Sequence, residues 1–168
     1  MLLVSNPTSE PELNSVRALM RAFVAWHRER HAQDLALIEA YFDQATFDAE
    51  LAALPGGYSP PRGSLLLATL EGEAAGCVAI RALDGQYCEM KRMFVYPRFH
   101  GLGVGLALGK RIISDARELG YRGIRLDTSI RQSEATSLYQ RLGFKVTAPY
   151  YDLPKELREW LVFMELLL

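Results

Sequence analysis

The sequence predicts an α/β fold in a single domain, residues 1–168, with a mixed, mostly antiparallel sheet flanked by helices. Three observations lead to this prediction. Apolar residues recur at helical spacing near the N-terminus, strand-like runs joined by short turns follow between residues 64 and 96, and helical and strand-like segments then alternate. The length suits one domain, and apolar residues make up 49% of the chain, which is enough to build a core.

The part of the chain before residue 64 is predicted to be helical and to end in a loop. Ser9-Glu10-Pro11-Glu12 has the pattern of a capping box with proline in the first turn, and helical spacing continues to about Glu29. Residues 35–41 and 47–54 predict two further helical pieces. The Pro/Gly-rich stretch 55–63 is expected to lack regular structure.

Strands dominate the next part of the chain. An antiparallel meander with a turn at Asp84-Gly85 is predicted for runs 64–70, 74–83 and 86–96. The remaining elements are predicted to be a helix at 106–119, a strand at 123–128, a helix at 134–142, a strand at 144–147 and a buried strand from residue 160.

Composition excludes several classes of partner. The formal net charge is −1 and charges of both signs are interspersed, which argues against nucleic acid. The apolar run at residues 161–168 is much shorter than the roughly 20 residues of a membrane helix. No secretory signal is expected, because Asn6-Pro7 interrupts the first apolar residues.

The two cysteines, Cys77 and Cys88, do not make a disulfide framework. They lie on neighbouring strands of the predicted meander. A two-residue turn between those strands would place Arg81 opposite Cys88 and Arg92 opposite Cys77, so the two sulfurs would not face each other. The sequence therefore predicts reduced thiols and a cytoplasmic protein.

A glycine-rich loop between the third predicted strand and the following helix is the most informative segment. Closely spaced glycines let a ligand approach the backbone, and free N–H groups at a helix start bind phosphate. A dinucleotide site, as in an NAD(P)-dependent oxidoreductase, is disfavoured because the third glycine of its motif would fall at Leu108. The preceding strand also carries three charged residues where a buried parallel strand should be apolar.

A second interpretation of the loop rests on a resemblance to a known family. Arg98-x-x-Gly101-x-Gly103 is similar to the R/Q-x-x-G-x-G/A signature of the Gcn5-related N-acetyltransferase (GNAT) family. The run from Leu138-Tyr139 to Gly143-Phe144 resembles the family's second element, and the resemblance covers about residues 64–148. It implies that acetyl-CoA is the co-substrate and that the acetyl group passes directly to an amine in a ternary complex. Segment 31–54 is long for this family and is a candidate helical insertion.

The resemblance also implies which residues hold acetyl-CoA. Two strands of the sheet would splay apart, and the pantetheine arm would bind main-chain groups of Met93, Phe94 and Val95. Arg98 would supply a cation near the pyrophosphate, and Gln132 stands where the family often has an asparagine that bonds the pantetheine. The pyrophosphate itself would bind to the loop residues His100, Gly101, Leu102, Gly103, Val104 and Gly105.

Tyr139 occupies the position of the family's general acid, which protonates the departing thiolate. Taken alone, this tyrosine also fits a core position, because it shares an apolar helix face with Leu138 and Leu142. The motif around it favours the catalytic role.

Glu89 is the candidate general base. Strand alternation would place it on the same side of the sheet as Val95, because the two residues are six apart. The alternative is a salt bridge from Glu89 to Lys91 or Arg92 at the sheet surface. So many charges in one core strand would be costly unless they were paired or hydrated, which indicates a wet cleft nearby.

The acceptor is expected to be a small-molecule amine, and the candidates for its site are Tyr58, Arg62 and Tyr150. His27 and His31 lie four apart but have no evident further ligands, so we expect a solvated helix end and no metal. A catalytically inactive CoA-binding sensor or partner module of the same fold is the main alternative function. The chain is expected to be a monomer or a homodimer, with the apolar last strand as a possible pairing edge.

Overall fold

The computed structural model describes residues 1–168, and its strands join one seven-stranded sheet in the order β1-β2-β3-β4-β5-β7-β6. Neighbouring strands run antiparallel except β4 and β5, which are parallel, so the predicted mixed, mostly antiparallel sheet is confirmed. The strands are β1 (Leu2–Ser5), β2 (Ser64–Leu70), β3 (Glu73–Ala82), β4 (Tyr87–Val95), β5 (Gly123–Ser129), β6 (Lys145–Thr147) and β7 (Leu161–Leu167).

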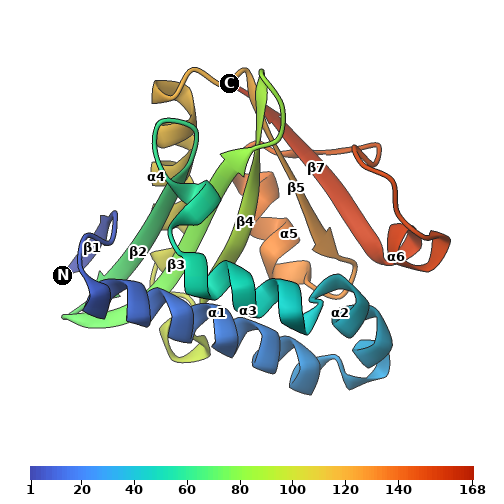
Figure 1. The fold of residues 1–168 in the computed structure, drawn as a ribbon, viewed down its shortest axis with the longest axis horizontal. Coiled ribbons are helices and arrows are strands. Elements are labelled where there is room, and N and C mark those ends of the chain that lie inside the picture. The colour runs from blue at the N-terminus through green and yellow to red at the C-terminus, as the bar shows by residue number, and fades with distance from the viewer.

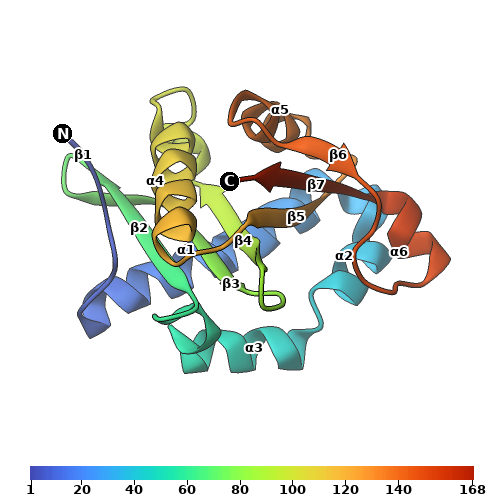
Figure 2. The same ribbon diagram turned by 90° about the horizontal axis from the view of Figure 1, so that it is seen from above.

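Helices cover both faces of this sheet, with α1, α2 and α3 on one face and α4 and α5 on the other (Figure 2). Each face has its own hydrophobic core, one beneath α1 and one beneath α4. No helix combines the length and apolar composition needed to cross a bilayer. The helices are α1 (Glu10–Arg30), α2 (Leu35–Tyr41), α3 (Gln44–Ala53), α4 (Val104–Glu118), α5 (Ser133–Arg141) and α6 (Lys155–Trp160).

The predicted capping box begins α1. The Ser9 hydroxyl accepts a hydrogen bond from the N–H of Glu12, and the Glu12 carboxylate accepts one from the N–H of Ser9 at 3.0 Å. These two bonds satisfy N–H groups that a helix start leaves free. The helix ends at Arg30, one residue beyond the expected end, and buries Val16, Leu19 and Met20 against the sheet.

The segment between α1 and β2 contains both predicted helical pieces. Helix α3 begins at Gln44, three residues earlier than expected, because the Asp43 carboxylate accepts a hydrogen bond from the N–H of Thr46 at 3.0 Å and caps the helix there. The loop at 55–63 is not wholly irregular, since Gly56–Tyr58 forms one 3-10 turn.

Strand β1 and helix α6 were not anticipated from the sequence. Each is short, and β1 is an edge strand whose conformation depends on antiparallel pairing with β2. The last strand, β7, lies between β5 and β6, and β6 pairs only with its residues 163–165. That β7 pairs across a dimer stays a prediction.

The register of the β3–β4 hairpin also differs from the expectation. Arg81 pairs with Glu89 instead of Cys88, because Asp84 accepts hydrogen bonds from the N–H groups of Gln86 and Tyr87 and lengthens the turn by one residue. A β-bulge then follows at Arg92, which has a positive φ of 61°, so Cys77 pairs with Phe94 rather than with Arg92.

This bulge reverses the alternation of side chains along β4. Lys91 pairs with Ala79, which belongs to the core beneath α1, whereas Met93 and Val95 pack in the core beneath α4. Glu89 lies on the Lys91 side of the sheet. The expectation that Glu89 shares a side with Val95 is thus wrong, because strict alternation fails at a bulge.

Strands β4 and β5 pair only at their beginnings, over Tyr87–Glu89 and Gly123–Arg125. Beyond these residues the two strands diverge, and α5 is visible behind the gap in Figure 1. The later part of β4 therefore has main-chain groups with no partner on its β5 side. This is the splayed arrangement that the sequence resemblance implied.

Candidate active site

A long cavity of about 450 Å³ lies between α1, the end of β4, the glycine-rich loop and α5. Its size falls in the usual range of ligand-binding clefts. The cavity, here called the outer cleft, is lined by Phe23, Trp26, Met93, Phe94, Val95, Phe99, His100, Gly101, Gly103, Val104, Gly105, Leu106, Gln132, Glu134, Ala135, Leu138 and Arg141.

The glycine-rich loop presents free main-chain donors to the outer cleft. The N–H groups of residues 101–106 donate to no acceptor in the protein. For residues 104–106 this is because α4 begins at Val104 and its first turn has no preceding helical carbonyls. Gly101 and Gly103 have left-handed φ angles of 78° and 82°, which favour glycine. A Cβ atom on either glycine would meet nothing within 4 Å, so the space in front of the loop is open. Such a cradle suits a phosphate group.

Most of the predicted cofactor-binding residues line the outer cleft, including Met93, Phe94, Val95 and Gln132. Two do not. Arg98 turns toward Glu73 at 3.4 Å and stacks on the rings of Tyr96 and Phe99, while the side chain of Leu102 is exposed to solvent. Leu102 can therefore contact a ligand in the cleft only through its main chain, and Arg98 can act only through its main chain or through long-range charge.

Two further predicted cofactor-binding residues have defined hydrogen bonds. The His100 ring nitrogen Nε2 lies 2.9 Å from the carbonyl oxygen of Val95 and ties the loop to β4. The side-chain oxygen of Gln132 accepts a hydrogen bond from the Thr128 hydroxyl at 2.5 Å. This leaves the amide NH2 group of Gln132 free to donate to a ligand.

A small inner pocket adjoins the outer cleft. The two share Phe23, Met93 and Gln132. The inner pocket has a free volume of about 40 Å³, the room of a few water molecules. Its other lining residues are His27, Tyr41, Phe42, Met90, Lys91, Arg92, Asp127, Thr128, Ser129, Tyr139, Trp160 and Leu161.

Tyr139 lies in the wall of the inner pocket. Only 6% of the residue is exposed, and its hydroxyl makes no hydrogen bond to the protein. Burial, and next the negative charge of Asp127, raise the pKa of Tyr139 well above its usual value. The hydroxyl therefore stays protonated at neutral pH and can donate a proton into the pocket.

Asp127, near the end of β5, is the carboxylate that lines the inner pocket. Its two oxygens accept hydrogen bonds from the hydroxyls of Tyr41 and Tyr151. Burial first, and then the charge of Asp127, raise the pKa of both tyrosines, so they remain donors. A carboxylate has about four lone-pair sites, which leaves Asp127 able to accept further hydrogen bonds from a ligand.

Glu89, the candidate base, lies outside the lining of both cavities. It is 3% exposed, and its carboxylate binds the Arg81 guanidinium at 2.9 Å and the Tyr150 hydroxyl at 2.6 Å. The anticipated salt-bridge alternative is thus present, but its main partner is Arg81 because of the shifted register. Lys91 is more distant, at 3.9 Å.

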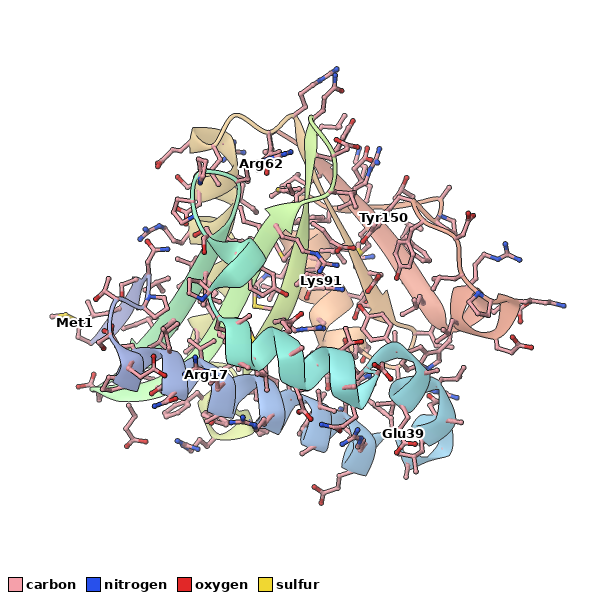
Figure 3. All side chains as sticks on the ribbon, in the orientation of Figure 1. Met1, Arg17, Glu39, Arg62, Lys91 and Tyr150 are labelled. Atoms are coloured by element: carbon pink, nitrogen blue, oxygen red, sulfur yellow. The ribbon has the colours of Figure 1, made fainter.

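The three residues suggested for the acceptor site also lie outside the lining. Tyr58 is buried and donates to Glu50 at 3.0 Å, and Tyr150 donates to Glu89. Arg62 is exposed and donates to the carbonyl of Asp84 at 2.9 Å. Figure 3 shows Arg62 at the end of the sheet away from α1, whereas Lys91 lies over the middle of the sheet.

His27 and His31 do not form a solvated helix end, so that expectation is wrong. His27 is 2% exposed and stacks between Phe23 and Trp160 with interplanar angles of 18°. Trp160 comes from α6, far away in the sequence, which is why local composition could not reveal the burial. His27 instead forms part of the inner pocket wall.

Acid should destabilise the protein through His27. Burial first, and then the nearby His31, lower the pKa of His27 from 6.5 to about 4. In the unfolded chain, His27 binds a proton as the pH falls below about 6.5, whereas in the folded chain it does so only near pH 4. Between these values acid favours the unfolded chain, so the free energy of unfolding decreases as the pH falls. We expect a loss of roughly 1 kcal/mol at about pH 5.5 relative to about pH 7.5.

Urea denaturation at these two pH values, on the wild type and on His27→Phe, measures this effect. The phenylalanine keeps the aromatic stack but cannot titrate, so the variant should lose less stability on acidification. An equal loss in both proteins would show that other groups are responsible.

Several residues that line the two cavities have no functional signal in the sequence. The sequence predicts Phe23 and Trp26 only as residues of a helix, and Tyr41 only as part of a helical piece. The charged run on β4 gave a usable signal, because it predicted a wet cleft next to Lys91 and Arg92. Asp127 carried no local signal, since its role depends on tyrosines from two other segments.

Together, the splayed strands, the phosphate-binding type of loop and a buried acid beside a carboxylate define a group-transfer enzyme with an elongated phosphorylated co-substrate. Residues 28–144 match the model of the Acetyltransferase (GNAT) family. The chain belongs to this family, which confirms the resemblance seen in the sequence. Its reaction class is acetyl-CoA-dependent N-acetyl transfer.

Known proteins resemble the chain to different extents. An uncharacterized N-acetyltransferase of Schizosaccharomyces pombe is 45% identical over 109 residues, covering 64% of this chain and 67% of that protein. Human N-acetylaspartate synthetase is 33% identical over 129 residues, which is 74% of this chain but 42% of the synthetase, so the chain spans less than half of that relative. The PaiA N-acetyltransferase of Thermoplasma acidophilum, solved with coenzyme A, shares the fold with a TM-score of 0.73, 16% identity and coverage of 100% and 99% of the two chains.

Proposed function

We propose that this protein transfers the acetyl group of acetyl-CoA directly to the amine of a small molecule, in a ternary complex. One observation carries the proposal. The free amides of residues 101–106 and the unpaired part of β4 form a continuous path that ends at Tyr139 and Asp127. Bound acetyl-CoA supplies a thioester-activated acetyl group. The residues along this path bind it, polarise its carbonyl and transfer the protons.

The amides of the glycine-rich loop hold the pyrophosphate, and the positive end of the α4 dipole adds to their attraction. Main-chain groups of Met93–Val95 bind the pantetheine arm as an additional strand would, with the free NH2 of Gln132 beside it. An N–H group near Val95 polarises the acetyl carbonyl. Such a preorganised donor stabilises the negative charge that develops on the oxygen.

Tyr139 acts as the general acid. Its hydroxyl is protonated, buried and free of other hydrogen bonds, so it can give its proton to the sulfur as the carbon–sulfur bond breaks. The tyrosine regains a proton from solvent after CoA leaves.

For the general base, the geometry favours Asp127 over Glu89. An amine with a pKa of about 8–10 enters mostly as an ammonium and must lose a proton before it attacks. Asp127 faces the inner pocket, whereas Glu89 lies behind the pocket wall in contact with Arg81 and Tyr150. Glu89 remains a candidate, and the two carboxylates can be tested separately.

Two observations support a small acceptor. The inner pocket has little free volume and is closed by the aromatic side chains of Tyr41, Phe42 and Trp160. The human relative is named for the synthesis of N-acetylaspartate, which is an acetylated amino acid.

Acetyl-CoA binding should fail when a negative charge is placed in the loop. Gly103→Asp puts a carboxylate in the open space before the free amides, and aspartate tolerates a left-handed φ. We expect calorimetry to show at least about 100-fold weaker acetyl-CoA binding, equivalent to about 2.7 kcal/mol. Gly103→Asn has the same shape without the charge and should bind much better.

NADH serves as the comparison ligand. The proposal requires binding of acetyl-CoA and none of NADH by the folded wild type. Binding of NADH, or equal affinity of the two variants for acetyl-CoA, would contradict the assignment of the loop to the co-substrate.

A further inference from the structure

Lys91 is a buried cation whose charge is incompletely matched. Its side chain is 11% exposed and its ammonium lines the inner pocket. The nitrogen Nζ donates to the Tyr41 hydroxyl at 3.1 Å, and its nearest carboxylate oxygen, Oε1 of Glu89, lies 3.9 Å away. Burying an ammonium is unfavourable unless it is well paired, so the incomplete pairing of Lys91 calls for an explanation.

The other cations around the pocket have close carboxylate partners. Arg92 binds Glu50 through two contacts of 2.8 and 3.0 Å. Arg81 also donates twice to Glu89, but both contacts, of 3.2 and 2.9 Å, reach the same oxygen, Oε1. The Tyr41 hydroxyl donates its hydrogen bond to Asp127, so toward Lys91 it can only accept one. Lys91 has three N–H donors, of which one is used at short range.

The phosphates of the co-substrate cannot supply the missing anion. They bind at the start of α4, at the outer end of the cleft, whereas Lys91 lies in the inner pocket with Tyr139 and Asp127. The remaining partner in the ternary complex is the acceptor. Figure 3 shows Lys91 over the middle of the sheet, where β4 and β5 have separated and an acceptor would meet the acetyl group.

We propose that the acceptor is a small amino acid-like amine that carries a carboxylate, with Lys91 binding the carboxylate and Asp127 receiving the ammonium. This inference rests on the proposed function and specifies its substrate class. Arg92 is neutralised by Glu50, so Lys91 and Asp127 are the two charged groups of the inner pocket that can match the two charges of a zwitterion, which keeps the buried site neutral. A polyamine or a simple amine has no carboxylate, so neither would give Lys91 the anionic partner that it lacks.

The test compares acceptors that differ by one carboxylate. The twenty amino acids and the amines that result from their decarboxylation are offered with acetyl-CoA, and thiol release is followed. We expect the best acceptor to be an amino acid with a kcat/KM at least about 10–100-fold above that of its decarboxylated counterpart.

Variants of Lys91 then test whether this residue causes the preference for amino acids over their decarboxylated counterparts. Lys91→Met keeps the length of the side chain and should raise the KM of the amino acid by about 10–100-fold, while acetyl-CoA binding stays intact. Lys91→Arg keeps the charge and cannot serve as a base, so it should restore part of the preference. Lys110→Met, on the exposed face of α4, is the matched control and should change nothing.

The outcomes separate this inference from the function on which it rests. Equal or better turnover of the decarboxylated amines, or an unchanged KM in Lys91→Met, would overturn the inference and leave the acetyltransferase standing. Acetyl-CoA binding without turnover of any amine in either set would overturn the small-molecule acceptor as well. Absence of acetyl-CoA binding by the folded wild type would overturn both proposals.

Discussion

Tyr139→Phe should lower kcat at least about 100-fold while leaving acetyl-CoA affinity nearly unchanged. The substitution removes only the hydroxyl, which is the proton donor that the inner pocket offers to a departing thiolate. Because this hydroxyl has no hydrogen-bond partner in the protein, its loss should change the free energy of unfolding by less than about 0.5 kcal/mol.

Thiol release measures kcat, calorimetry measures acetyl-CoA binding, and urea denaturation measures stability. Tyr121→Phe is a matched control, since the Tyr121 hydroxyl donates to the carbonyl of Arg62 far from the cleft. Full activity of Tyr139→Phe would remove the general acid from the mechanism. If the wild type binds acetyl-CoA but shows no activity, the result would instead favour an inactive CoA-binding module.

Asp127→Asn should lower kcat by about 10²–10⁴-fold, the usual contribution of a positioned base. Asparagine has nearly the same shape but cannot take a proton from the acceptor. The defect should shrink as pH rises toward the pKa of the acceptor amine, about 8–10, because more of the amine is then already deprotonated. A purely structural defect would not recover in this way.

Glu89→Gln is the matched control for that experiment. It makes the same chemical change in a carboxylate that lies behind the pocket wall, bound to Arg81 and Tyr150. We expect a much smaller change in kcat and no recovery at high pH. A larger defect in Glu89→Gln than in Asp127→Asn would reverse the assignment of the base.

The elements of this protein that could be predicted from the sequence are those determined by local motifs. The capping box of α1, the glycine loop before α4 and the tyrosine of α5 each depend on neighbouring residues, and all three are visible in the sequence. The spacing of apolar residues along the sequence predicted the meander and the alternation of helices and strands that follows it. The order of strands confirmed the mixed sheet that these elements implied.

The inner pocket could not be predicted in the same way because distant segments build it. Asp127 depends on Tyr41 and Tyr151, and His27 is buried by Trp160. The bulge at Arg92 had no sequence signature, since an arginine with positive φ is unusual, yet it decides which side chains of β4 face the pocket. Placing Glu89 correctly required knowledge of that bulge.

Amide NMR can show whether coenzyme A binds along β4 and the glycine loop. Titration of the protein with coenzyme A should shift the N–H resonances of residues 93–95 and 101–106 most strongly, because these groups have no acceptor in the free protein or face the splayed gap. Shifts confined to other parts of the chain, or no binding by the folded protein, would contradict the account.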